Sequence, residues 1–218
     1  MSEEVQAKKP SIWGILWSPT EQFERIKERP RIWGALAIVT ILFVIGMYLS
    51  SFGKIPEING VSEEDLAGMQ AFNSVLMIVM GIITPIFGIL ISTVIYFLIA
   101  KIARSEVSFK QLFSMNTYIM ILSALSILIN GIGIALLGGT SDTIYTSLGS
   151  IIQAEGALGG FLTGLEVFTI WGVILNAIGL HKVAEFSKGL AWTISIAFFV
   201  IGLIFSMIAA GVSGMVGV

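Results

Sequence analysis

Apolar and polar residues follow one another in long blocks along this chain. Five apolar blocks extend over Ile32 to Phe52, Val75 to Ala100, Tyr118 to Leu137, Phe161 to Leu180, and Leu190 to Ala210. Each block is close to the roughly 20 apolar residues that a helix needs to cross the hydrocarbon core of a bilayer. The pattern therefore predicts an all-α fold class: a polytopic membrane protein with a bundle of five transmembrane helices.

The composition excludes a soluble globular protein. Of the 218 residues, 56% are hydrophobic and 12% are charged, whereas an average soluble domain has about 25% charged residues. The mean hydropathy is +0.93. The chain has no cysteine, which excludes a disulfide framework, a thiolate nucleophile and a cysteine-ligated metal.

The distribution of basic residues predicts the orientation in the membrane. Eleven of the twelve Lys and Arg residues precede the first block or follow the second and fourth blocks. Because basic residues near span ends are retained in the cytoplasm, we expect a multi-pass protein of the cell membrane with its N-terminus in the cytoplasm and its C-terminus outside. Residues 1–31 would then form a cytoplasmic segment, and residues 32–213 a five-span membrane domain.

The polar segment before the first block carries the signals of a short helix. Ser18 is a suitable N-cap, Pro19 fits the first helical position, and Glu21 stands where a capping box needs an acidic residue. Pro30 ends the helix, because the residue before a proline disfavours helical backbone.

This short helix is predicted to be amphipathic and to lie at the membrane interface. Phe23 and Ile26 share one face, and Glu21 can pair with Arg25 four residues later. Lipid headgroups of the inner leaflet would attract its basic residues. Two roles stay open: a collar that anchors the first span, or a surface that binds a partner. The residues of the partner-binding hypothesis are Pro19, Phe23, Arg25, Ile26 and Pro30.

Glu166 is the only acidic residue inside the predicted spans, and an ionisable residue within a membrane is a functional candidate. Asn130 in the third span would reach a similar depth, so a hydrogen bond between these two residues is plausible. Rotation of 100° per residue places Thr169 and Asn176 on the same side of the fourth span as Glu166. These polar residues either hold helices together or line a path for an ion or proton.

Glycines occupy the opposite side of the fourth span. The residues concerned are Gly156, Gly160, Gly164 and Gly172. Small residues at four-residue spacing let membrane helices approach closely. We therefore expect this span to be central, with glycines packed on one side and polar groups on the other.

No motif for catalysis is predicted to assemble. GVSG at residues 211–214 matches the sequence around the nucleophile of rhomboid-type intramembrane proteases. A nucleophile needs its base within hydrogen-bond reach, and Ser213 and the single histidine, His181, are predicted at opposite ends of their spans. The sequence also has no phosphate loop, dinucleotide fingerprint, clustered metal ligands or nucleic-acid-binding patch. We therefore expect no enzyme activity, no cofactor, no metal and no nucleic-acid partner.

Two stretches of the chain resemble the Yip domain family, the Ypt-interacting multispanning membrane proteins, in its prokaryotic form. The first is the amphipathic segment with Pro19, Phe23, Arg25 and Pro30, followed by five spans. The second is IWGVILNAIGLHKVAEFSKGLAW, which resembles the family's junction between the fourth and fifth spans. The matching residues in this junction are Trp171, Gly179, Leu180, Ser187 and Lys188.

The resemblance implies a non-enzymatic membrane protein that assists the assembly or activity of other membrane proteins. Its partners would be the lipid bilayer and other membrane proteins, with an ABC-type exporter as one candidate and a homo-oligomer as another. The alternative from the residues themselves is a small ion or solute channel or transporter that uses Glu166.

Overall fold

The computed structural model describes residues 8–54 and 62–216, and these residues are organised as helices. The helices are α1 (Gly14–Trp17), α2 (Pro19–Glu28), α3 (Trp33–Ser50), α4 (Glu63–Ile102), α5 (Phe109–Ile119), α6 (Ile121–Leu137), η1 (Leu148–Ser150), α7 (Gly156–Gly164), α8 (Val167–Lys182) and α9 (Lys188–Val216). Within the described residues, α3, α4, the α5–α6 pair and α9 are long and apolar enough to cross a membrane, and α8 is a shorter apolar helix. The predicted all-helical polytopic class is confirmed.

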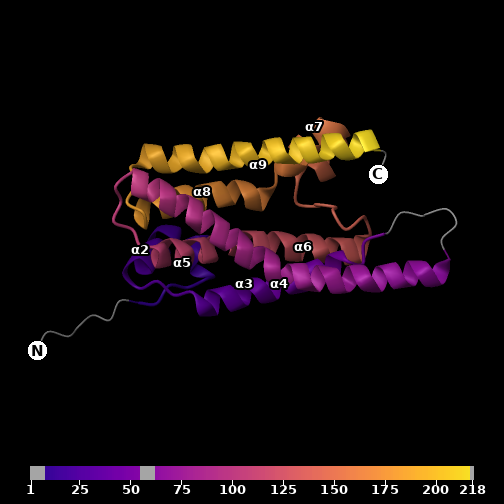
Figure 1. The fold of residues 1–218 in the computed structure, drawn as a ribbon, viewed down its shortest axis with the longest axis horizontal. Coiled ribbons are helices and arrows are strands. Elements are labelled where there is room, and N and C mark those ends of the chain that lie inside the picture. Colours follow the sequence, from indigo (N-terminus) through magenta and orange to yellow (C-terminus); the bar gives the residue numbers. More distant parts are fainter. Residues whose placement is uncertain (1–7, 55–61, 217–218) are drawn as a thin grey trace, which may run out of the picture.

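The helices form two groups that are joined along the bundle (Figure 1). In the first group α3 packs against α4 and α6, and in the second α9 packs against α7 and α8. Contacts of α6 with α8, and of α2 with α5 and α8, connect the groups. Residues 24–31, 101–110 and 181–188, which include nine of the twelve Lys and Arg residues, lie at one end. We call it the basic end.

Helix α4 is long and bent. Its 40 residues correspond to about 60 Å at 1.5 Å per residue, about twice the thickness of a bilayer core. The helix changes direction about halfway along (Figure 1). Pro85 lies inside the helix, where a proline removes one hydrogen bond of the helical ladder. The C-terminal half reaches the second group, where the ring of Tyr96 meets that of Phe198 edge-on at 5.3 Å between centroids.

Three glycines bring the backbones of the first group together. A Cβ atom on Gly131 would lie 2.3 Å from the carbonyl oxygen of Gly46, and one on Gly46 would lie 2.7 Å from the backbone of Ile127. A Cβ atom on Gly81 would lie 2.7 Å from Cα of Val44. Helices α3, α4 and α6 therefore pack at backbone distance, the arrangement that small residues permit in membranes.

The fourth predicted span is not one continuous helix. Helix α7 ends at Gly164 and α8 begins at Val167, and Glu166 between them has an extended backbone with φ −105° and ψ 142°. Two backbone hydrogen bonds join this break to the loop between α6 and α7. N of Leu148 donates to O of Leu165 at 3.1 Å, and N of Val167 donates to O of Thr146 at 3.3 Å. A strand-like pairing with the loop thus replaces helical bonds at this point.

The predicted start of the N-terminal helix is correct in position and wrong in its cap. Pro19 occupies the first helical position and α2 ends at Glu28, before Pro30. Ser18 makes no side-chain cap bond, so the expected capping box is not formed. Its hydroxyl instead donates to the carbonyl oxygen of Gly14 at 3.2 Å. This bond joins α2 to the preceding turn of helix α1.

Gly131→Ala should force α3 and α6 apart and lower the free energy of unfolding by about 1–3 kcal/mol, the usual cost of overpacking. Thermal unfolding of the purified protein in detergent measures this. Gly202→Ala in α9 is the matched control, because its added methyl group meets no atom within 4 Å. Equal unfolding temperatures for the two variants would contradict the close packing of α3 on α6.

Candidate functional site

Glu166 is the centre of a buried polar cluster. Its side chain is 7% exposed, and both carboxylate oxygens accept hydrogen bonds from hydroxyl groups. Ser126 of α6 and Thr146 of the following loop donate to Oε1, the latter at 2.7 Å. Thr169, in the first turn of α8, donates to Oε2 at 2.8 Å. The carboxylate therefore joins α6, the loop and α8.

Asn130 completes this cluster without touching Glu166 directly. Its Nδ2 donates to Oγ1 of Thr146 at 2.9 Å, and its Oδ1 accepts from N of Thr146 at 3.1 Å. Nδ2 also lies 3.3 Å from Oγ of Ser126. The predicted contact between Asn130 and Glu166 is therefore indirect, through two hydroxyl groups. Sequence reasoning missed Ser126 and Thr146, because a single hydroxyl in an apolar helix or in a loop carries no spacing signal.

Glu166 is the residue directly before α8, and its side chain makes no hydrogen bond to the backbone of that helix. The hydroxyl donors instead supply the hydrogen bonds that a buried polar side chain requires. A cavity of about 270 Å³ reaches Ser126 and Asn130 from the side of α3 and α4. The cavity thus adjoins one hydrogen-bond partner of Glu166, Ser126, while Glu166 itself does not line it.

Asn176 lies apart from this cluster. Asn176 follows Glu166 by ten positions, which is a distance of about 15 Å along a helix. Its Nδ2 donates to the hydroxyl of Tyr96, and its Oδ1 is buried without a hydrogen-bond partner among the described residues. Of the predicted intramembrane polar residues, Glu166, Asn130 and Thr169 come together, and Asn176 belongs to a second contact between α8 and α4.

The predicted packing glycines also separate into different environments. A Cβ atom on Gly160 would lie 2.3 Å from O of Ser206 in α9, and Gly164 faces Leu203 of the same helix. Gly156 has a positive φ of 58° and open space around it, and Gly172 in α8 has only ordinary contact with α6. Because the chain breaks at Glu166, these four glycines do not share one helix face.

The structure places the apolar face of α2 in the protein core. Phe23 and Ile26 are 0% exposed and belong to the cluster that also contains buried residues of the spans. Arg25 forms the predicted ion pair with Glu21. While α2 stays docked, Phe23 and Ile26 are not available to a partner or to lipid. Pro19 is the first residue of this docked helix, and Pro30 follows its end at Glu28.

One of the family-matched residues of α8, Gly179, lies directly against α2. A Cβ atom on Gly179 would lie 2.9 Å from Sδ of Met115 and 3.1 Å from the ring of Phe23. Leu180 is fully buried, and Trp171 packs against the same core. Gly179 therefore leaves the space that the aromatic ring of α2 occupies.

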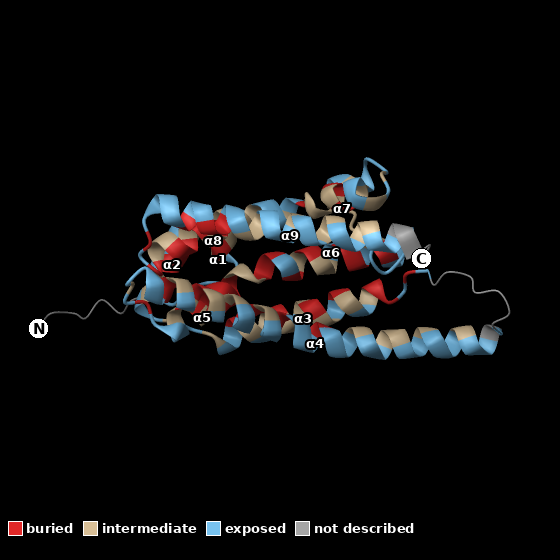
Figure 2. Ribbon diagram, turned by 45° about the horizontal axis from the view of Figure 1, so that its top comes forward, coloured by how far each residue is buried: buried red, intermediate tan, exposed pale blue. Residues whose placement is uncertain are grey.

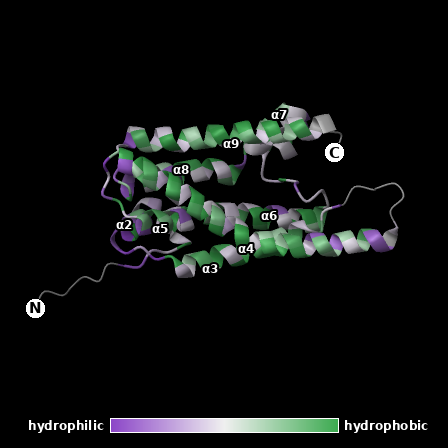
Figure 3. Cartoon of the chain, viewed as in Figure 1, coloured by the Kyte–Doolittle hydropathy of each residue, from purple (hydrophilic) through white to green (hydrophobic). Residues whose placement is uncertain are grey.

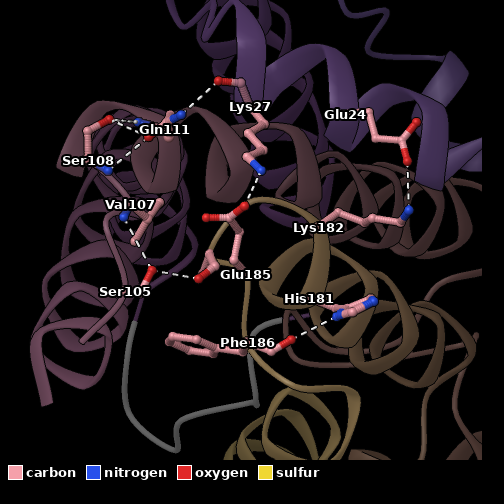
Figure 4. A network of polar contacts seen from close by, with 11 residues as sticks. Glu24, Lys27, Ser105, Val107, Ser108, Gln111, His181, Lys182, Glu185 and Phe186 are labelled. Atoms are coloured by element: carbon pink, nitrogen blue, oxygen red, sulfur yellow. Dashed lines mark hydrogen bonds and ion pairs between the residues drawn. The ribbon is translucent and has the colours of Figure 1, made fainter. Parts of the chain in front are cut away.

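Polar contacts fasten the same end of the bundle (Figure 4). Nζ of Lys182 lies 2.6 Å from the carboxylate of Glu24, and Lys27 pairs with Glu185. Nε2 of Gln111 donates to O of Lys27 at 2.7 Å. These bonds link α2 with the start of α5 and with the turn between α8 and α9. Their partners are far apart in the chain, so no sequence spacing indicates them.

The remaining two family-matched residues begin helix α9. Oγ of Ser187 accepts a hydrogen bond from N of Leu190 at 3.3 Å, as an N-cap does. Lys188 is the first residue of α9 and is exposed. It stands beside a cavity at the basic end.

Glu166→Ala should lower the free energy of unfolding by about 1–3 kcal/mol, because the variant leaves three hydroxyl donors without their acceptor. Thermal unfolding in detergent is the measurement. Glu155→Ala, which removes an exposed carboxylate eleven residues earlier, is the control and should unfold at the wild-type temperature. If Glu166→Ala is as stable as this control, the cluster does not hold the three segments together.

Phe23→Ala should cost about 3–5 kcal/mol, the loss expected for an aromatic ring removed from a core. Trp17→Ala is its control, because Trp17 is 85% exposed and surface substitutions change stability by about 0.5 kcal/mol or less. The measurement is limited proteolysis of the N-terminal segment at increasing denaturant concentration, which reports the loss of α2 docking in each variant. Equal protease sensitivity of the two variants would show that α2 is not part of the core.

Comparison with known proteins agrees with the resemblance seen in the sequence. A family model described as the Yip1 domain matches residues 13–210, a region that includes the helices from α1 to α8 and most of α9. Membrane protein YknW of Bacillus subtilis (strain 168) is 34% identical over 221 residues, which cover 96% of this chain and 94% of that protein. No solved structure matches the chain. The chain thus belongs to the Yip1 domain family and is an integral membrane protein.

Proposed function

We propose that this protein is a non-enzymatic accessory or scaffold protein that binds another membrane protein complex and assists its assembly or activity. The proposed partner class is an ABC-type exporter, which is what the family resemblance favours. The exposed surface of α4 is the observation that carries the proposal.

Exposed apolar side chains extend along a length of α4 that is greater than the thickness of the hydrocarbon core. Large exposed apolar side chains extend from Met69 to Ile102, about 50 Å of helix, whereas the hydrocarbon core is about 30 Å thick. Figure 2 shows the N-terminal half of α4 exposed along its length and projecting past the other helices. Figure 3 shows this half of α4 as mainly hydrophobic toward the bend and as mixed hydrophobic and hydrophilic toward its projecting end.

The projecting part of α4 is the proposed contact for the partner. Oγ of Ser74 lies 3.0 Å from Oγ of Ser51, the residue after α3, which marks the level at which α3 ends. Phe72 lies at this level, where it lines a pocket with Gly53 and Lys54, and it is 70% exposed; Met69 is 42% exposed. Exposed apolar side chains outside the hydrocarbon core would favour a protein contact over water. A protein surface would cover them more fully than headgroups and water.

We also propose the orientation in which the basic end faces the cytoplasm and the C-terminus lies outside. The three basic segments come from distant parts of the chain and lie at the same end of the bundle (Figure 1). This arrangement supports the proposed orientation, because basic residues near span ends stay in the cytoplasm. The projecting end of α4 would then face the exterior.

We do not extend the proposal to a channel or transporter. The oxygens of Glu166 are hydrogen-bonded to Ser126, Thr146 and Thr169. Asn176, which a polar path would need, contacts Tyr96 instead. This arrangement supports a structural tie between helices.

A photo-crosslinking amino acid in place of Phe72 tests the proposal in native membranes. It should capture a subunit of an ABC-type exporter, identified by mass spectrometry, and Phe72→Ser should reduce recovery of the same subunit with the tagged protein. The matched control is the same crosslinker in place of Phe205 in α9, which is 67% exposed and should react with lipid. Capture of no exporter subunit, or equal capture from both positions, contradicts the proposal; capture of this chain by itself indicates a homo-oligomer.

A further inference from the structure

A cavity of about 420 Å³ lies at the basic end, between the start of α2, the end of α8 and the start of α9. Its wall includes Thr20, Ile178, His181, Lys182, Lys188 and Trp192. None of these residues takes part in the polar cluster around Glu166 or in the exposed surface of α4. The cavity combines positive charge with an aromatic ring.

The positive charge in this cavity is only partly neutralised by the protein. Nζ of Lys182 is paired with Glu24 at 2.6 Å, and this lysine side chain is 32% exposed. Lys188 forms no ion pair with another residue in the described part of the chain. It is also the first residue of the 29-residue helix α9, whose N-terminus adds a partial positive charge. An anionic group is the ligand that this charge favours.

His181 lines the cavity, and a hydrogen bond holds its ring in place. Its Nδ1 lies 2.7 Å from the carbonyl oxygen of Phe186 in the turn before α9. The contact holds the imidazole ring between the end of α8 and the start of α9 (Figure 4). The two lysines therefore project from segments whose relative position is set by a hydrogen bond within the turn.

An apolar stripe leads away from the cavity along α9. Trp192, Ile196 and Val200 follow one another at four-residue spacing, which places them on one helix face, and they are 43%, 48% and 45% exposed. The stripe covers about 12 Å from the cavity toward the middle of the apolar helix. Tryptophan is also typical of the boundary between headgroups and tails.

We propose that this cavity binds the phosphate-bearing headgroup of an anionic phospholipid. The phosphate lies between Lys188 and Lys182, and one acyl chain follows the stripe formed by Trp192, Ile196 and Val200. Basic pockets between membrane helices recognise anionic headgroups in this way. The stripe favours a lipid over free phosphate, because a soluble anion has no use for an apolar surface.

The test is native mass spectrometry of the purified full-length protein with equal amounts of phosphatidylglycerol and phosphatidylcholine that carry the same acyl chains. We expect preferential retention of phosphatidylglycerol. Lys188→Gln should weaken this binding about fivefold, the contribution of one basic residue near an anionic surface. Lys101→Gln is the matched control, because Lys101 also lies at the basic end but stacks on Phe97, 4.9 Å from the ring centroid, and does not line the cavity.

Three results would overturn the proposal. Equal retention of the two lipids would show that the cavity does not recognise an anionic headgroup. An equal loss with Lys188→Gln and Lys101→Gln would show a general charge effect. Displacement of phosphatidylglycerol by millimolar inorganic phosphate, with no effect of Trp192→Ala, would identify a site for the free anion. Unchanged unfolding temperature of Lys188→Gln excludes misfolding as the cause of lost binding.

Discussion

The buried carboxylate of Glu166 is the constraint on which the part of the fold away from the basic end depends. A polar side chain removed from water needs hydrogen-bond donors close by, and the backbone of a continuous helix has none to spare at its middle. The chain meets this requirement by ending α7 before Glu166 and by bringing the hydroxyl groups of Ser126, Thr146 and Thr169 to the carboxylate. The break in the fourth span, the course of the loop and the contact between α6 and α8 all follow from satisfying one side chain.

The basic end is held by a different combination of forces. Here the docking of α2 buries Phe23 and Ile26, and ion pairs from Glu24 and Lys27 fix the helix against the neighbouring turns. Exposed ion pairs contribute little stability individually, so burial of the apolar face accounts for most of the docking. The pairs set the position of α2, and that position also shapes the cavity with Lys182 at its edge.

The contacts at the two ends leave much of the outer surface of the helices without a protein neighbour. Polar contacts hold the loop at one end and α2 at the other, while α4 and α9 are exposed along much of their length (Figure 2) and have apolar side chains there. A membrane covers part of this surface without any specific contact. The length of α4 and the charge beside α9 are the features that lipid tails alone do not account for, and they are where partner and headgroup recognition are proposed.

Periodicity and composition were sufficient for the membrane class, four of the apolar spans and the ends of α2, because these follow from local chain properties. They did not distinguish a helix face that meets lipid from one that meets protein, since both are apolar; Phe23 shows this. Nor did they identify which glycines lie at backbone contacts, because Gly131 and Gly172 look alike in an apolar block. The sequence by itself determined which segments enter the membrane, and only the tertiary structure decided how Glu166 breaks its span, because its hydrogen-bond donors come from segments that are brought together only on folding.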